Sequence, residues 1–348
     1  MNTLQYRVSF TGTVSYCDGA DDDRAAVVLD DSGITSDSDY RRVAPTLVDL
    51  VVLEARPSSL TVDALVERLE QYRPARLVAV GSGAVMDVAK VAYQRFRADG
   101  GAVELEFVPC GREPYRAVAR FAVVDELDGS RPTVVDPSFG AGHVIVSEAL
   151  LARVAPRVLA IGALDTAVHA IESLLSTKSA PFSALLASTA LRTVLGPDPK
   201  PVEIVTASFV AAEAFASTRL GLAHAIASPL GTRLGVTHDE INGVLGDAVL
   251  EFWADTERAR VVATASDTAS VAAVRTRLAR ARVAAELPTT LRDLNVAWDD
   301  ITAILPRAAQ SSGIEVLPGP LVDGALEFFA SRAWRDTHTK EEPVARPA

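Results

Sequence analysis

Short apolar runs alternate with amphipathic stretches through the first part of the chain. Runs typical of buried strands stand at residues 25–29, 50–53, 77–80, 105–108 and 121–124. Apolar positions recur with helical spacing at residues 61–73 and 84–97. Because strands that alternate with helices usually form a parallel sheet, the pattern predicts an α/β domain with a Rossmann-like parallel sheet over residues 1–146.

The pattern changes at about Ser147. Stretches rich in Ala, Leu and Val follow with helical spacing almost without interruption to Trp334, and prolines divide them. Such a succession predicts an all-α second domain over residues 147–336. The last segment, residues 337–348, is polar and contains two prolines, which predicts a disordered tail.

Composition narrows the class of protein. A chain of 348 residues exceeds what one core usually holds, so two domains are expected. The hydrophobic content of 49% excludes a largely disordered chain. The net charge of −11, without a basic stripe, argues against a nucleic-acid partner.

Location follows from what the sequence lacks. No apolar run of the roughly 18–20 residues that span a bilayer stands out, and no signal-peptide pattern begins the chain. Two cysteines do not suggest a disulfide framework. We therefore expect a cytoplasmic protein with no membrane partner.

One carboxylate and three imidazoles are the first candidates for chemistry. Asp165 and His169 are four residues apart in a helical stretch, which places both on one helix face about one turn apart. His224 and His238 follow. Such a set suits Fe²⁺ or Zn²⁺ with an open position that could polarise a substrate oxygen. Taken singly, each histidine is more typical of a packed or surface position.

A glycine turn directly follows the apolar run at residues 77–80. The candidate nucleotide-binding residues here are Gly81, Ser82, Gly83, Ala84, Asp87 and Lys90. Backbone N–H groups at such a turn, with the dipole of the helix that follows, can approach a pyrophosphate. The turn lacks the full dinucleotide fingerprint. A tight strand-to-helix turn that binds nothing is therefore an equal alternative, as is simple pairing of Asp87 with Lys90.

Charged residues at two strand ends bear on the choice of nucleotide. Asp30 and Asp31 follow the run at 25–29, where a carboxylate can accept a hydrogen bond from an adenosine ribose and so favour NAD(H). Arg112 and Arg116 follow the run at 105–108, where a guanidinium can meet the 2′-phosphate of NADP(H) or an anionic substrate. Ordinary turns and solvated loops contain the same residues, so the choice stays open.

Four motifs occur in a recognisable order. They read GSGAVMDVAK at residues 81–90, DTAVHAIE at 165–172, GLAHAIASPLG at 221–231 and THDEING at 237–243. In this order they resemble the GGGSxxDxxK, DAxxHAxE, GLxHxxxHPLG and PHGxxNA motifs of the iron-containing (group III) alcohol dehydrogenases, in the dehydroquinate synthase-like superfamily. The resemblance runs from about Ala25 to Trp334.

The resemblance implies a fold, a metal site and a cofactor. It implies the α/β domain and all-α domain of that family, and a divalent metal, Fe²⁺ or Zn²⁺, held by Asp165, His169, His224 and His238. It also implies NAD(H) or NADP(H), a small carbonyl or alcohol substrate, and a homodimer, because many relatives are dimers. Glu172, one turn beyond His169, is expected either to orient a metal ligand or to lie at the surface.

The chain departs from the family pattern at two places. Ser228 stands where the family has a second histidine that relays a proton near the nicotinamide, and a serine hydroxyl does not titrate near neutrality. The family's TTxGTGSE loop is replaced by CGREPYR at residues 110–116. Cys110 and Arg112 therefore become the candidate cofactor contacts in that loop.

Three functions fit these observations. The preferred one is a metal-dependent NAD(P)H alcohol dehydrogenase, or aldehyde or ketone reductase, of specialised metabolism, with Ser228 and Glu172 at the catalytic site. The second keeps the metal for non-redox chemistry, such as a cyclisation, elimination or hydration, on a degenerate nicotinamide site. The third is a non-catalytic binding relative, against which the intact set of metal ligands argues.

Overall fold

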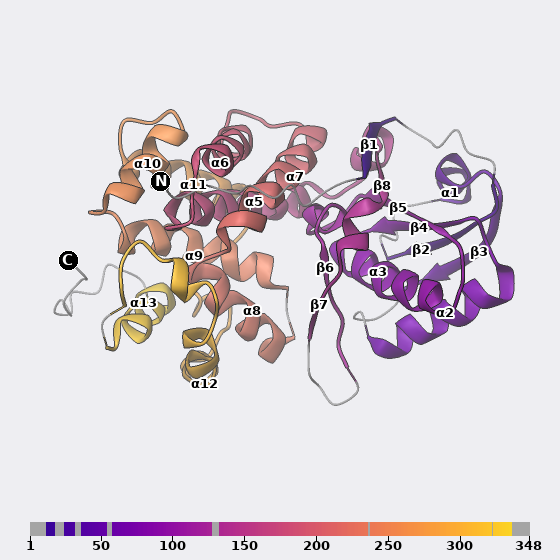
Figure 1. Cartoon of the computed structure of the whole chain (residues 1–348). Helices are drawn as coiled ribbons and strands as arrows, with labels where there is room; N and C mark the ends of the chain where they lie inside the picture. Colours follow the sequence, from indigo (N-terminus) through magenta and orange to yellow (C-terminus); the bar gives the residue numbers. More distant parts are fainter. Residues whose placement is uncertain are drawn as a thin grey trace, which may run out of the picture. The chain divides into compact units, whose positions relative to one another are not determined.

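The described residues form two compact units, drawn in Figure 1. The computed structural model describes residues 12–17, 24–31, 36–53, 58–126, 132–235, 237–321 and 323–335. An α/β unit lies within residues 8–155 and also takes in residues 200–209, and a helical unit lies within 156–199 and 210–348. The domain limits at 146 and 147 stay a prediction, and the expected tail, 337–348, lies outside the described residues.

Six parallel strands form the sheet of the α/β unit, in the order β1-β8-β5-β4-β2-β3. They are β1 (Thr13–Tyr16), β2 (Ala26–Asp30), β3 (Leu47–Val52), β4 (Arg76–Gly81), β5 (Glu104–Pro109) and β8 (His143–Val146). Strands β2 and β4 are buried along their whole length. Their continuous apolar runs are typical of parallel strands covered on both faces, which confirms the predicted sheet.

The helices of this unit lie between the strands or directly after the last one. They are α1 (Asp37–Val43), α2 (Ser59–Tyr72), α3 (Gly83–Ala98), α4 (Glu148–Leu151) and the 3₁₀ helices η1 (Pro114–Ala117) and η2 (Pro137–Ala141). Helices α2 and α3 pack against each other and against the sheet. Helix α3 begins directly after β4 because the Ser82 side chain accepts a hydrogen bond from the Ala84 N–H.

One expected strand lies outside the parallel sheet. Strand β6 (Phe121–Val123) pairs antiparallel with β7 (Thr133–Val135) in a separate two-stranded ribbon. The apolar run at 121–124 could not distinguish the two arrangements. A short connection permits antiparallel pairing, whereas a parallel neighbour requires a crossover of a dozen or more residues.

Helices make up the second unit. They are α5 (Pro156–Leu175), α6 (Pro181–Val194), α7 (Pro201–Thr218), α8 (Leu222–Leu234), α9 (His238–Phe252), α10 (Glu257–Ala265), α11 (Val271–Ala284), α12 (Trp298–Ala309), η3 (Ile314–Val316) and α13 (Ala325–Trp334). The first residues of α7 belong to the α/β unit. Pro156, Pro181 and Pro201 each begin a helix, where proline costs no hydrogen bond.

Helix α5 forms the centre of the helical unit, in contact with α6, α9, α10 and α11. It is long and apolar enough to cross a membrane, which corrects the expectation that no such run exists. However, 83% of its most apolar window is buried inside the protein, as in the core helix of a globular unit.

Two glycines let α9 approach α5 closely. A Cβ atom at Gly243 would lie 2.8 Å from Leu164 Cδ2, and one at Gly246 would lie 2.7 Å from Val168 Cγ2. Both neighbours belong to α5, within a turn of Asp165 or His169. The close approach therefore sets the position of α9 relative to the polar residues of α5.

Candidate functional site

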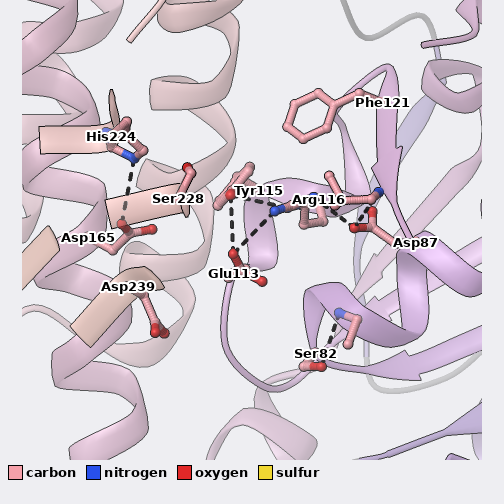
Figure 2. A network of polar contacts seen from close by, with 12 residues as sticks. Ser82, Asp87, Glu113, Tyr115, Arg116, Phe121, Asp165, His224, Ser228 and Asp239 are labelled. Atoms are coloured by element: carbon pink, nitrogen blue, oxygen red, sulfur yellow. Dashed lines mark hydrogen bonds and ion pairs between the residues drawn. The ribbon is translucent and has the colours of Figure 1, made fainter. Parts of the chain in front are cut away.

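Helices α5 and α8 bring three of the predicted metal ligands together. One ligand atom each from Asp165, His169 and His224 lies within 4.8 Å of the others, and all three residues are buried. His169 Nδ1 lies 3.6 Å from Asp165 Oδ2, and His224 Nε2 lies 4.0 Å from Asp165 Oδ1. Figure 2 shows Asp165 and His224 facing each other from separate helices.

Ring contacts hold the two imidazoles of this cluster. The His169 and His224 rings stack with their centroids 4.5 Å apart and an interplanar angle of 21°. The His169 ring also contacts Phe215 of α7, at a centroid distance of 4.9 Å. Rings packed in this way present their nitrogen atoms in fixed directions.

His238 lies at the margin of the cluster. It is the first residue of α9 and is half-buried, and its ring centroid lies 6.0 Å from that of His224. It is not part of the group whose ligand atoms fall within 4.8 Å of one another. The structure thus brings three of the four expected ligands together, and His238 as a ligand stays a prediction.

Glu172 determines which nitrogen of His224 faces the cluster. Its Oε2 atom lies 2.7 Å from His224 Nδ1, and the carboxylate also accepts hydrogen bonds from the backbone N–H groups of Gly221 and Ala223. With three donors on one carboxylate, His224 Nδ1 carries its proton and Nε2 keeps its lone pair. Nε2 is the atom that faces Asp165, so Glu172 orients a candidate ligand.

The Asp165 carboxyl group has a pKa above its usual range. Burial raises the pKa of Asp165 to about 6, and Asp239 adds to the rise, while His238 and His224 oppose it. A divalent cation favours the ionised form of a carboxylate that it contacts. The buried carboxyl group is therefore suited to a cation partner.

Asn242 and Asp239, both on α9, were not singled out from the sequence. Asn242 Nδ2 donates to Asp165 Oδ1 at 2.9 Å and to His224 Nε2 at 2.8 Å. Asp239 is fully buried beside the cluster and stands where the family motif has glycine. Two signals could have found them: the four-residue spacing of His238 and Asn242, and an acid in place of a motif glycine.

The donor set fits a divalent cation. One carboxylate oxygen and two imidazole nitrogens, buried and close together, are ligands that Fe²⁺ and Zn²⁺ accept. Asn242 already draws Asp165 and His224 toward one point through a single amide nitrogen. A cation between those two residues would compete with Asn242 for the same acceptor atoms.

Ser228 lies on α8 four residues after His224, about one helical turn away, and its side chain is exposed. Figure 2 labels both side chains. Its hydroxyl can pass a proton to or from water. It cannot by itself hold a proton in the way that the histidine of the family motif can.

In the α/β unit, Asp87 and Lys90 bind the chain's own loop. Asp87 Oδ2 accepts hydrogen bonds from Arg116 Nη1 at 2.7 Å and from the Val123 N–H at 3.0 Å. Lys90 Nζ donates to the carbonyl oxygens of Arg116, Ala119 and Phe121. Burial lowers the pKa of Lys90 to about 7, while Asp87 opposes the change. Both side chains thus hold the segment that follows β5.

Of the other predicted nucleotide contacts in this segment, Arg116 and Cys110 are buried, and Arg112 contacts the turn through its backbone. The Arg116 side chain is 8% exposed and contacts the Tyr115 and Phe121 rings as well as Asp87. Cys110 is buried, and its N–H donates to the Gly81 carbonyl at 3.0 Å. Arg112 accepts a hydrogen bond at its carbonyl from the Gly83 N–H.

Asp30 and Asp31 differ in what they contact. The Asp30 carboxylate is buried and accepts a hydrogen bond from the Tyr40 hydroxyl at 2.5 Å. Asp31 instead reaches the glycine turn, where Ser82 donates to it through both its N–H and its hydroxyl. Of the two carboxylates, Asp31 is therefore the one at the proposed nucleotide position.

The glycine turn does not fit a pyrophosphate in this conformation. The N–H groups of Ser82, Gly83 and Ala84 donate to Asp31 Oδ1, the Arg112 carbonyl and Ser82 Oγ, at 2.9, 2.9 and 3.2 Å. Those are the groups that a phosphate would use at the start of a helix. A nucleotide would have to displace partners that the chain itself supplies.

Comparison with known proteins finds alcohol dehydrogenases among the sequences similar to this chain. The sequence model described as "Fe-containing alcohol dehydrogenase family, C-terminal" matches residues 159–321. The chain is 28% identical over 245 residues to "Probable alcohol dehydrogenase EutG" of Escherichia coli (strain K12), covering 64% of this chain and 62% of that protein. It is 25% identical over 284 residues to "1-propanol dehydrogenase PduQ" of Salmonella typhimurium, covering 75% and 77% of the two chains.

A solved structure shares the fold. The sulfoacetaldehyde reductase from Bifidobacterium kashiwanohense, in complex with NAD⁺, superposes with a TM-score of 0.84 at 19% identity, covering 95% of this chain and 99% of that one. At that identity the likeness concerns the fold alone. The match to EutG spans less than two thirds of that protein's length.

Proposed function

Since this chain belongs to the iron-containing alcohol dehydrogenase family, we propose that it interconverts an alcohol and an aldehyde or ketone, with a divalent metal and NAD(H) or NADP(H). The observation that carries the proposal is the buried cluster of Asp165, His169 and His224, whose ligand atoms lie within 4.8 Å of one another. Small substrates are favoured by the name of one similar protein, a 1-propanol dehydrogenase.

The metal would be held by Asp165, His169 and His224, with His238 as a fourth ligand. When bound, it would supply a Lewis acid for the oxygen of a carbonyl substrate. Glu172 holds the His224 ring with Nε2 toward Asp165. The exposed Ser228 hydroxyl, one turn beyond His224, would pass a proton between the site and water.

A second candidate is metal-assisted chemistry without hydride transfer, such as an elimination or hydration. The observation that favours it is the glycine turn, whose N–H groups are bonded to Asp31, Arg112 and Ser82. Among the residues that the structure describes, no comparable feature favours a non-catalytic role. A homodimer, a cytoplasmic location and a place in specialised metabolism stay predictions.

The test combines metal content with turnover. We expect His224→Ala to lose bound Fe²⁺ or Zn²⁺, measured by mass spectrometry, together with NADH- or NADPH-dependent reduction of propanal and sulfoacetaldehyde. His143→Ala is the matched control, because His143 belongs to the α/β unit and hydrogen-bonds to Ser15. Unchanged metal content in His224→Ala would remove the proposed site. Metal binding without oxidation of either nucleotide would favour the non-redox candidate.

A further inference from the structure

Strands β2 and β4 are neighbours in the sheet, and the chain leaves their carboxyl ends toward opposite sides of the sheet. From β2 the chain continues to the edge strand β3, whereas from β4 it continues to β5 on the other side. In open α/β sheets, ligands bind in the crevice between two such strands. Asp31 directly follows β2, and Ser82 directly follows β4, so the two residues border this crevice.

The Asp31 carboxylate occupies the anion-binding end of α3. Oδ1 accepts a hydrogen bond from the Ser82 N–H at 2.9 Å, and Oδ2 accepts one from the Ser82 hydroxyl. Ser82 is the N-cap of α3, where exposed N–H groups and the helix dipole attract an anion. A carboxylate of the chain itself thus has the contacts that a phosphate would make.

The glycines of this region are required by the chain's own contacts. A Cβ atom at Gly81, where φ is +134°, would collide with Asp31 Oδ1. One at Gly83 would lie 2.6 Å from Arg116 Cγ, and one at Gly111 would lie 3.0 Å from the Ser82 nitrogen. These approaches account for the glycines without a nucleotide. The replaced loop, residues 110–116, therefore packs directly on the turn.

Buried interactions anchor that loop. Arg116 pairs with Asp87 at 2.7 Å, and Lys90 donates to carbonyl groups at both ends of the segment from Arg116 to Phe121. Burial also raises the pKa of Asp31, an effect that its hydrogen bonds from Ser82 oppose. A phosphate that entered here would meet a carboxylate and a loop held in place.

We propose that Asp31 is an internal occupant of the phosphate position, so that a nucleotide binds at this turn only when the Asp31 carboxylate is displaced. Asp31 then limits nucleotide affinity instead of contributing to it. The proposal rests on the proposed function only in naming a nicotinamide nucleotide as the ligand. The contacts of Asp31 at the glycine turn would oppose the binding of any phosphate-bearing molecule.

The test is calorimetric titration of the metal-loaded protein with NADH, NADPH and inorganic pyrophosphate. Asp31→Asn keeps the shape of the side chain and an acceptor for the Ser82 N–H but removes the charge. We expect it to bind pyrophosphate and nucleotide about tenfold more tightly than the unmodified protein, because a neutral acceptor is held less strongly than a carboxylate. Asp31→Ala, which removes the acceptor altogether, should gain at least as much.

Asp63→Asn is the control for net charge, because Asp63 is exposed on α2 of the same unit and pairs only with Arg95 among the ion pairs described. It should leave all three affinities unchanged. Equal or weaker binding by both Asp31 variants would overturn the proposal, and weaker binding would make Asp31 a nucleotide ligand. Tighter pyrophosphate binding by Asp31→Asn without binding of either nicotinamide nucleotide would support the closed turn and contradict the proposed cofactor.

Discussion

Individual residues set the chemistry of the helical cluster through their hydrogen bonds. The Glu172 side chain is buried, and two backbone N–H groups and the His224 ring satisfy its oxygen atoms. The same carboxylate therefore anchors the start of α8 and fixes the His224 tautomer. The sequence placed Glu172 near His169 by helical spacing, but the contact with His224 spans 52 positions and could not be read from spacing.

The Glu172→Gln variant isolates this effect at the residue scale. The amide keeps the shape of the side chain but removes the negative charge that lies 2.7 Å from His224 Nδ1. We expect affinity for Fe²⁺ or Zn²⁺ to fall by roughly 10–100-fold, as with other residues that orient metal ligands. Competition with a chelating dye measures it. Glu315→Gln, on an exposed acid of the same unit, should bind metal normally; an equal loss in both variants would contradict a specific role for Glu172.

At the scale of elements, helix packing decides where the polar side chains of α9 lie. Gly243 and Gly246 allow α9 to contact Leu164 and Val168 of α5 directly. Asn242 precedes Gly243 on α9 and meets Asp165 of α5 at 2.9 Å. The candidate metal cluster thus depends on an interhelical approach that only residues without a side chain permit.

The Gly246→Ala variant tests this dependence. Its Cβ atom would lie 2.7 Å from Val168 Cγ2, so the helices must separate. We expect the free energy of unfolding to fall by about 1–3 kcal/mol, measured by denaturant titration, with weaker metal binding. The matched control is Gly162→Ala on α5, where a Cβ atom would meet nothing within 4 Å. That variant should gain about 0.5–1 kcal/mol, because alanine suits a helix interior better than glycine. Equal effects in the two variants would contradict the packing argument.

For the whole molecule, the described ligand cluster belongs to one of the two units. Asp165, His169 and His224 all come from the helical unit, whereas Asp31 and the glycine turn belong to the α/β unit. A ligand that binds only the folded state stabilises what it contacts, by about 2.7 kcal/mol at one hundred times its dissociation constant. Metal and nucleotide should therefore stabilise different parts of the chain.

Removing the metal with a chelator tests that expectation. Hydrogen exchange of the amides in α5, α8 and α9 should become faster, because local opening of these helices no longer costs the metal-binding energy. Amides in β2 and β4 should exchange at unchanged rates. Faster exchange throughout both units, or in neither, would place the metal elsewhere. Exchange in the His224→Ala variant, with and without chelator, provides the control.

Local patterns in the sequence were sufficient for the elements and for part of the site. Apolar periodicity located the buried strands β2 and β4 and the succession of helices, because strand and helix spacing is a property of neighbouring residues. The same rule placed Asp165 and His169 on one face of α5. The motif order indicated the iron-containing alcohol dehydrogenase family, whose C-terminal model matches residues 159–321.

Tertiary packing decided everything that joins distant segments. Asp31 meets Ser82 across 51 positions, and Asn242 meets Asp165 across 77, so neither contact has a signature in local spacing. The pairing of β6 with β7 and the separation of the His238 and His224 rings depend likewise on how whole elements pack together. The packing of the complete fold selects the partner of each side chain. The glycine turn therefore resembles a phosphate site in the sequence, whereas in the structure the Asp31 carboxylate binds its Ser82 N–H and hydroxyl groups.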